Sequence, residues 1–104
     1  MLEQTVGGLM MIRKIKNYFK NCNKQVYKNC LKDEIIDLKA SNGLEEINIR
    51  YGICIGIISL AEDLGIIGPL KGTIKYNEIY EIAKNMEAIV RYNNFVADKK
   101  EDNQ

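Results

Sequence analysis

Apolar residues recur every three or four positions along three stretches of the chain, which is the period of an amphipathic helix. The first stretch covers residues 11–32, and helical character extends through residues 34–38, either continuously or after a bend. The second runs from about residue 44 to 66 or 67, and the third from about residue 77 to 97. The pattern predicts an all-α fold, a compact bundle of three main helices within a single domain of residues 11–97.

The first stretch is strongly two-sided when it is projected at 100° per residue. Apolar side chains fall on one side and lysines sweep the other, so the stretch is a basic amphipathic helix. The apolar side comprises Ile12, Ile15, Tyr18, Phe19, Cys22, Val26 and Cys30. The lysine side comprises Lys14, Lys16, Lys20, Lys24, Lys28 and Lys32.

The second stretch is apolar on both faces, which predicts a central helix covered by the other two. One stripe is Ile47, Tyr51, Cys54, Ile58 and Ala61, and the other is Ile49, Ile53, Ile57, Leu60 and Leu64. The segment INIRYGICIGII is also rich in β-branched residues, so a buried strand remains an alternative. The length of the apolar pattern favours the helix. Asn42 as a side-chain cap with Glu45 three residues later favours it too.

Glycine and proline separate the second stretch from the third. Gly65 is a candidate C-terminal cap, and Gly68–Pro69 interrupts helix. Asn77 is a candidate cap for the third helix, and residues 98–104 read as a solvated tail. The apolar face of the third helix comprises Ile79, Ile82, Ala83, Met86, Ile89, Val90 and Phe95.

Gly52 and Gly56 have the spacing of two small residues that lets helix backbones approach closely. In a bundle of three helices this spacing favours a tight crossing within one core. A seam between two copies of the chain is the alternative, and it leaves a homodimer open.

Residues 1–10 are predicted to be a flexible leader. Two glycine codons at Gly7 and Gly8 can read GGAGG, the sequence that recruits a bacterial ribosome. Met10 and Met11 then lie at a workable distance for initiation. We therefore expect translation to start at Met10 or Met11. A loose chain end is the simpler alternative.

Charge is segregated along the chain although the net charge is only +1. Residues 11–32 carry seven positive charges and no acid, whereas residues 33–63 carry seven acids against two bases. The candidate binding residues for a macromolecular surface are Lys16, Lys20, Lys24, Lys28 and Lys32. They suit an acidic protein first, nucleic acid second and an anionic membrane least. The basic helix has one Arg, and its Phe19 lies on the opposite side, which weakens the nucleic-acid reading. The simplest interpretation of this pattern is a lysine-rich solvent face without a specific partner.

The residue inventory argues against catalysis. The chain has no His, which removes Ser–His and Cys–His nucleophile arrangements and imidazole metal sites. The three cysteines lack the spacing of metal or redox motifs and read as small buried hydrophobes. No opposed carboxylate pair is evident. We therefore expect no catalytic residue, no metal ligand, no cofactor and no enzymatic activity. The longest apolar run, residues 51–61, is too short to span a bilayer, which predicts a cytoplasmic protein.

The function expected is that of a small non-enzymatic binding protein that occludes a host macromolecule, as an inhibitor or anti-defence protein does. The abundance of Ile, Lys and Asn follows AT-rich codons, which points to a phage or other mobile element of a low-GC bacterium. One alternative is a nucleic-acid-binding protein that uses the basic helix. Another is an immunity-like or structural module. The segment EIYEIAKNMEAIVRYNNF resembles, over less than a fifth of the chain, the last helices of bacteriocin immunity proteins and phage-borne inhibitors.

Overall fold

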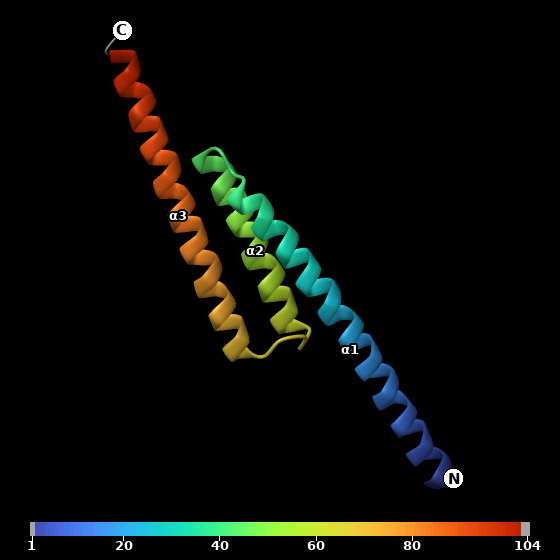
Figure 1. Cartoon of the computed structure of the whole chain (residues 1–104). Coiled ribbons are helices and arrows are strands. Elements are labelled where there is room, and N and C mark those ends of the chain that lie inside the picture. Colours follow the sequence, from blue (N-terminus) through green and yellow to red (C-terminus); the bar gives the residue numbers. More distant parts are fainter. Residues whose placement is uncertain (1, 103–104) are drawn as a thin grey trace.

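Three long helices make up the part of the chain that the computed structural model describes. The described part is the backbone of residues 2–102 and the side chains of residues 13–14 and 23–100. The helices are α1 (Leu2–Lys39), α2 (Leu44–Asp63) and α3 (Pro69–Asp102), and no described residue is in a strand. Successive helices run in opposite directions, and α2 packs against both others (Figure 1). The predicted all-α bundle with a central second helix is confirmed, and the strand alternative for residues 47–58 is wrong.

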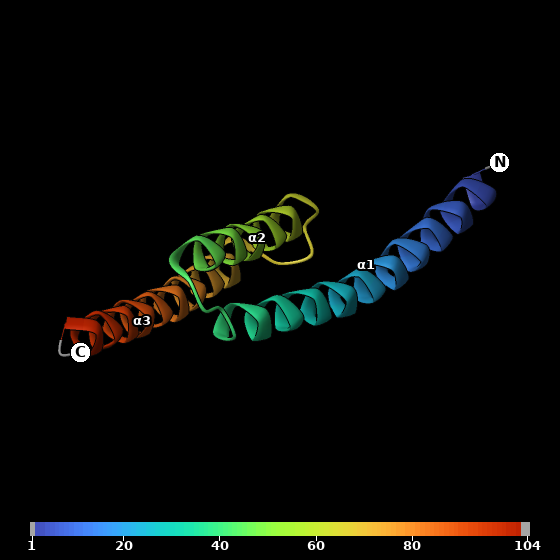
Figure 2. The ribbon, with the colours of Figure 1, turned by 90° about the horizontal axis from the view of Figure 1, so that it is seen from above.

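The bundle is elongated because α1 and α3 are much longer than α2. The helices have 38, 20 and 34 residues, and the Cα trace extends over 86 × 20 × 14 Å. Figures 1 and 2 show the N-terminal part of α1 and the C-terminal part of α3 projecting beyond α2 at opposite ends. The three-helix core therefore forms only over the length that α2 can cover.

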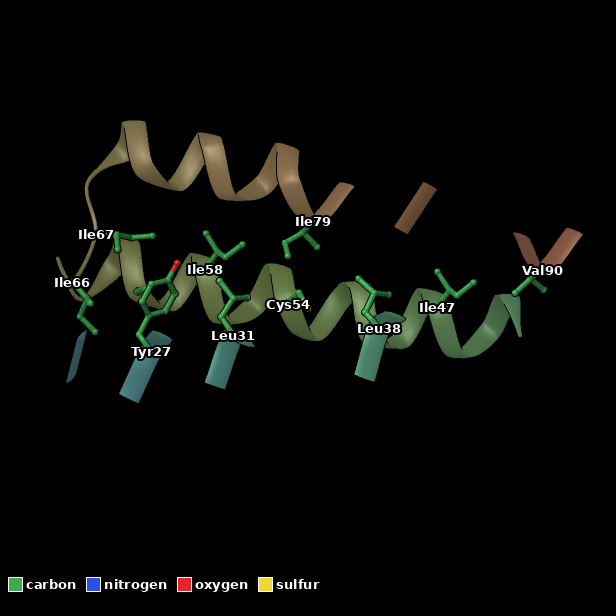
Figure 3. Packing of buried hydrophobic residues seen from close by; sticks show 11 residues of the cluster. Tyr27, Leu31, Leu38, Ile47, Cys54, Ile58, Ile66, Ile67, Ile79 and Val90 are labelled. Atoms are coloured by element: carbon green, nitrogen blue, oxygen red, sulfur yellow. The ribbon is translucent and has the colours of Figure 1, made fainter. Parts of the chain in front are cut away.

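The core lies along α2 and is built from all three helices. Cys54 and Ile58 of α2, Leu38 of α1 and Ile79 of α3 are completely buried. Figure 3 shows Leu31 and Leu38 extending from α1 toward α2. The other buried apolar residues are Tyr27, Ile47, Ala61, Ile66, Ile67 and Val90. Of the two α2 stripes predicted to be covered, the one through Cys54 and Ile58 is buried, with Tyr51 half-buried. The prediction is wrong for the other stripe, in which Ile49, Ile53, Leu60 and Leu64 are exposed.

A three-residue ion-pair cluster ties α1 to α2 at the edge of this core. A guanidinium nitrogen of Arg50 lies 3.4 Å from a carboxylate oxygen of Glu34 and 3.6 Å from one of Asp37. Arg50 and Glu34 are half-buried. The cluster joins the start of α2 to the end of α1.

The buried side of α1 differs from the prediction. Val26 is 60% exposed and Cys30 is exposed, whereas Tyr27, Leu31 and Leu38 are buried. The Val26 and Cys30 stripe continues into the acids Asp33 and Asp37, while the neighbouring stripe stays apolar to the end of the helix. Burial follows the stripe that can contact α2 over its full length. The other residues of the predicted stripe lie outside the described side chains, and they are Ile12, Ile15, Tyr18, Phe19 and Cys22.

Helix α1 is continuous from Leu2 to Lys39, with no interruption between residues 32 and 39. It includes residues 2–10, for which the sequence predicted a flexible leader. Initiation at Met10 or Met11 stays a prediction, because a backbone conformation does not report where translation begins.

The predicted cap of α2 is wrong by one residue. Gly43, not Asn42, is the N-cap, with an extended backbone and no side-chain cap hydrogen bond. The acid that bonds back is Glu46 rather than Glu45, and its Oε2 accepts from the backbone N–H of Asn42 at 3.3 Å. An acid at the third helical position still satisfies a free donor next to the helix start.

The end of α2 is closed by Gly65, as predicted, but the helix ends at Asp63 rather than at residue 66 or 67. Gly65 has φ +69°, a left-handed conformation that favours glycine. Its N–H donates to the Glu62 carbonyl at 3.0 Å, and the Ile66 N–H donates to the Ala61 carbonyl at 2.8 Å. These are the two bonds of a Schellman motif, and its apolar contact is supplied by buried Ile66 and Ala61.

Helix α3 begins eight residues earlier than predicted. It starts at Pro69, not at Asn77, because proline suits the first helical position, where its missing N–H has no helical partner. The Gly72 N–H donates to the Gly68 carbonyl at 3.0 Å and closes the first turn. The helix also continues to Asp102, so residues 98–102 of the predicted tail are helical. On the predicted apolar face, Ile79 and Val90 are buried, whereas Ile89 and Phe95 are exposed.

Candidate binding groove

An open groove of about 710 Å³ lies between α1 and the first turns of α3. Residues 24–39 of α1 form one wall, α3 forms the other, and Ile67 in the α2–α3 loop contributes to the floor. We call this the lysine-rimmed groove. Its lining residues are Lys24, Tyr27, Lys28, Leu31, Lys32, Ile35, Ile36, Lys39, Ile67, Lys71, Ile74 and Lys75. A volume of this size falls in the range of about 300–1,000 Å³ found for ligand sites.

The floor of the groove is apolar. Tyr27, Leu31 and Ile67 are buried and belong to the core, so the floor is held by the same packing as the fold. Ile36 and Ile74 are each 56% exposed and stand on the two walls. A partner that covered them would remove aliphatic surface from water.

The rim of the groove is cationic. Six lysines line it, four from α1 and two from α3, and no described lining residue is acidic. The Lys75 Nζ lies 3.1 Å from a carboxylate oxygen of Glu78. Within the described residues the other five form no ion pair. Like charges along both walls of a low-dielectric cleft concentrate a positive potential in it.

Helix geometry explains how lysines distant in sequence meet here. Lys24, Lys28 and Lys32 repeat every four residues, so they remain on one side of α1 beside the buried stripe. Lys39 extends the same wall because α1 does not end at residue 32. Lys71 and Lys75 are also four residues apart, and they join the opposite wall because α3 begins at Pro69.

The structure places three of the five predicted binding lysines on the groove. Lys24, Lys28 and Lys32 lie on the groove, whereas the side chains of Lys16 and Lys20 are outside the described residues. Sequence reasoning missed Lys39, Lys71 and Lys75. No local signal marks them, because their role depends on how α1 and α3 pack.

Tyr27 on the floor of the groove carries an unsatisfied polar group. Its hydroxyl is buried and has no hydrogen-bond partner among the described residues. Burial raises the pKa of Tyr27, and the charges of Glu78 and Glu62 raise it further, so the phenol stays protonated. In Figure 3 the hydroxyl points from α1 toward the region between Ile58 and Ile67.

The Glu62 carboxylate is packed against the first turn of α3. Its Oε1 is buried without a hydrogen-bond partner among the described residues, and it occupies the place where a side chain on Gly72 would begin. A carboxylate near a helix N-terminus is favoured by the helix dipole. Glycine at position 72 therefore permits this approach.

Gly52 and Gly56 do not form the predicted tight crossing within the chain. Both are exposed, and no described atom lies within 4 Å of where a Cβ on either would sit. The close-packing interpretation is wrong for the isolated chain, because α1 and α3 contact the opposite side of α2. A seam between two copies stays a prediction.

A second, uncharged groove of about 250 Å³ runs between α1 and α2. Its lining residues are Asn23, Val26, Tyr27, Cys30, Ile57, Leu60, Ala61, Leu64 and Ile66. The outer α2 stripe that was expected to be covered borders it, and four of its five residues are exposed. The two grooves thus differ in chemistry: one is rimmed by lysines and the other is apolar.

The described cysteines differ in environment. Cys54 is completely buried, as predicted, and burial together with the Glu34 charge raises its pKa to about 11, with Arg50 acting in the opposite direction. Cys30 is exposed, which contradicts the prediction of a buried hydrophobe. Among the described residues, no group of three His, Cys, Asp or Glu side chains gathers where it could hold a metal ion. No described helix has a stretch long and apolar enough to cross a membrane.

In comparisons with protein-family models, curated proteins and solved structures, the chain matches none.

Proposed function

We propose that the protein is a non-enzymatic binding protein that captures an acidic, amphipathic segment of a partner protein in the lysine-rimmed groove. The observation that carries this proposal is the combination of six rim lysines, an aliphatic floor and no acidic lining residue. Charge complementarity selects the partner and speeds its encounter, and apolar contacts on the floor hold it.

The shape of the groove suits a helical ligand. Lys24 and Lys39 are fifteen residues apart along α1, which corresponds to about 22 Å, or roughly four helical turns. The volume accommodates the apolar side chains of one helix face rather than a whole helix. A segment with leucine-like residues on one stripe and Asp or Glu on both flanks would match the floor and the two walls.

The groove favours a protein ligand over nucleic acid. Single strands are held largely by base stacking on exposed aromatic rings, and the only aromatic residue of the lining is Tyr27, which is 8% exposed. Phosphates also gain nothing from a floor of Leu and Ile. The lysines alone would still attract a polyanion, so nucleic acid is an outcome that the experiment must separate.

We further propose that binding acts by occlusion. The groove is large enough to cover one recognition element of a partner. The Ile-, Lys- and Asn-rich composition supports a mobile element of a low-GC bacterium as the source, with host machinery as the target class.

The test is a pull-down from a low-GC bacterial lysate, with and without nuclease, using two charge-matched variants. The groove variant carries Lys24→Gln, Lys28→Gln and Lys32→Gln. The control carries the same change at three α3 lysines outside the groove, Lys84, Lys99 and Lys100. Lys84 and Lys99 lie over the rings of Tyr80 and Phe95, at 5.4 Å and 5.0 Å from the centroids.

The proposal predicts a discrete protein that survives nuclease, is retained by the control and is lost from the groove variant. Nucleic acid in the bound fraction, or proteins that disappear on nuclease treatment, would contradict it. Equal losses from both variants would show that total charge, not the groove, drives capture.

A further inference from the structure

One side of the α1–α2 pair carries a strip of exposed aliphatic side chains. We call it the apolar α2 face, and it comprises Val26, Ile49, Ile53, Leu60 and Leu64. These residues are 39–62% exposed. The four α2 members lie on one side of the helix, and Val26 lines the uncharged groove together with Leu60 and Leu64.

This face is a large apolar patch, although by itself it is smaller than one side of a standard interface. Its five side chains leave on the order of 500 Å² of apolar surface in water, within the range of about 300–600 Å² for the largest patch on a monomer, which is often a functional surface. A standard stable interface covers roughly 800 Å² on each partner. The neighbouring Gly52, Gly56 and Cys30 are also exposed and supply part of the remainder.

The spacing of the α2 residues is symmetric about the middle of the strip. Ile49, Ile53, Leu60 and Leu64 are separated by four, seven and four residues. When two such helices cross antiparallel about a two-fold axis near Gly56, Ile53 faces Leu60 of the second copy. Ile49 then faces Leu64 of that copy. An isologous interface requires contact residues that are placed symmetrically about the two-fold axis, as these are. Contact with an unrelated partner does not require such symmetry.

Charge separates this face from the lysine-rimmed groove. No described Lys, Arg, Asp or Glu side chain lines the uncharged groove, and the charged residues of α2 lie near its two ends: Glu45, Glu46, Arg50, Glu62 and Asp63. In a two-fold symmetric dimer each face packs against an identical face, so a charge at its centre would lie near the same charge of the other copy. A face without charges at its centre avoids this repulsion. The six rim lysines would repel their own copies and cannot form such a contact.

We propose that the apolar α2 face seats a second copy of the chain in an antiparallel, two-fold symmetric dimer. Gly52 and Gly56 then let the two α2 backbones approach closely, which explains two glycines that no described atom approaches within the isolated chain. The lysine-rimmed groove lies between α1 and α3, so the dimer displays two such grooves. This inference does not depend on what the groove binds.

The experiment measures molar mass by light scattering and sedimentation from low to high micromolar concentration. The seam variant carries Ile53→Glu and Leu60→Glu, which place acids at the centre of the interface. The control carries the same charge change off the face, Ile89→Glu and Tyr92→Glu, where the native residues are 51% and 67% exposed. Far-UV circular dichroism checks that each chain remains helical.

The proposal predicts that the wild-type chain and the control have twice the 11.9 kDa monomer mass, whereas the seam variant is a helical monomer. If the seam variant loses helix, Gly56→Leu serves instead, because the isolated chain has room for a side chain there. A wild-type monomer at all concentrations overturns the proposal. A dimer that tolerates both the seam variant and Gly56→Leu, or that the control also dissociates, overturns it as well.

Discussion

Replacing Gly52 and Gly56 with alanine should change the stability of the isolated chain and of the dimer in opposite directions. In the isolated chain both glycines are exposed in the interior of α2, and a Cβ at either position meets no described atom within 4 Å. Alanine therefore brings no clash. It removes backbone freedom from the unfolded chain and improves helix propensity.

The magnitude follows from the helix-propensity difference. An exposed Gly→Ala change inside a helix contributes about 0.5–1 kcal/mol. The two sites share no side-chain partner, so the double variant should gain about 1–2 kcal/mol in free energy of unfolding. For a domain of this size that gain corresponds to a rise in Tm of roughly 5–15 °C. In the proposed dimer the two methyl groups would separate the α2 backbones and weaken association.

The assay is urea unfolding followed by far-UV circular dichroism at a dilute and a high protein concentration. At the dilute concentration, where the monomer dominates, the double variant should unfold at higher urea with an unchanged m-value. At the high concentration the wild type should gain stability from association, and the variant should gain less. If the variant is less stable than wild type even when dilute, an element of the same chain covers the glycines and the reasoning is wrong.

Three further changes test the core. Ile58→Ala should lower the free energy of unfolding by about 2–5 kcal/mol because Ile58 is completely buried. Ile89→Ala, at a 51% exposed site, should change it by less than about 0.5 kcal/mol. Similar losses for the two variants in urea unfolding would contradict the assignment of Ile58 to the core. Tyr27→Phe should leave stability unchanged or raise it by about 1 kcal/mol, because it removes a buried hydroxyl without a partner, and a clear loss would show that the hydroxyl is bonded. Since the pKa of Cys54 is raised from 9.0 to about 11, its thiol ionises first in the unfolded chain, and stability should fall by up to about 2 kcal/mol as pH rises from about 9 to 11. Cys54→Ala should flatten this fall, and an unchanged slope would assign it to other groups.

Local patterns predicted α2 well because the information needed lies within the helix and its ends. The stripe through Cys54 and Ile58 has the period of one helix face, and it is buried. Gly65 provides the positive φ that ends the helix. At the other end of α2 the predicted N-cap was one residue too early. Gly43 is the N-cap, and the Glu46 carboxylate accepts a hydrogen bond from the backbone N–H of Asn42.

Long-range packing explains what the sequence could not predict. Val26 and Tyr27 are adjacent on α1, and which of them is buried depends on the direction from which α2 approaches. Residues 69–76 carry proline and glycine and were expected to be a loop, but Pro69 starts the helix that positions Lys71 and Lys75. The groove therefore contains three predicted lysines of α1 together with Lys39, Lys71 and Lys75, which only the fold could place there.

The outer α2 stripe is helical as predicted but is largely exposed rather than buried. Its apolar period correctly identified a helix face, yet burial within the same chain does not follow from period alone. Two long neighbours contact the opposite side of α2 and leave Ile49, Leu60 and Leu64 in water. An exposed apolar stripe in a small domain is typical of a surface that binds another molecule.

The most direct test of the central claim is lysine reactivity in the native complex. The protein is captured with its partner from lysate, and acetylation of each lysine is quantified by mass spectrometry in the free and bound states. The account predicts protection of Lys28, Lys32, Lys39 and Lys71 on both walls of the groove, with Lys84 and Lys100 equally reactive in the two states. Protection of the α3 lysines outside the groove, or equal reactivity throughout, would contradict the assignment of the lysine-rimmed groove as the binding site.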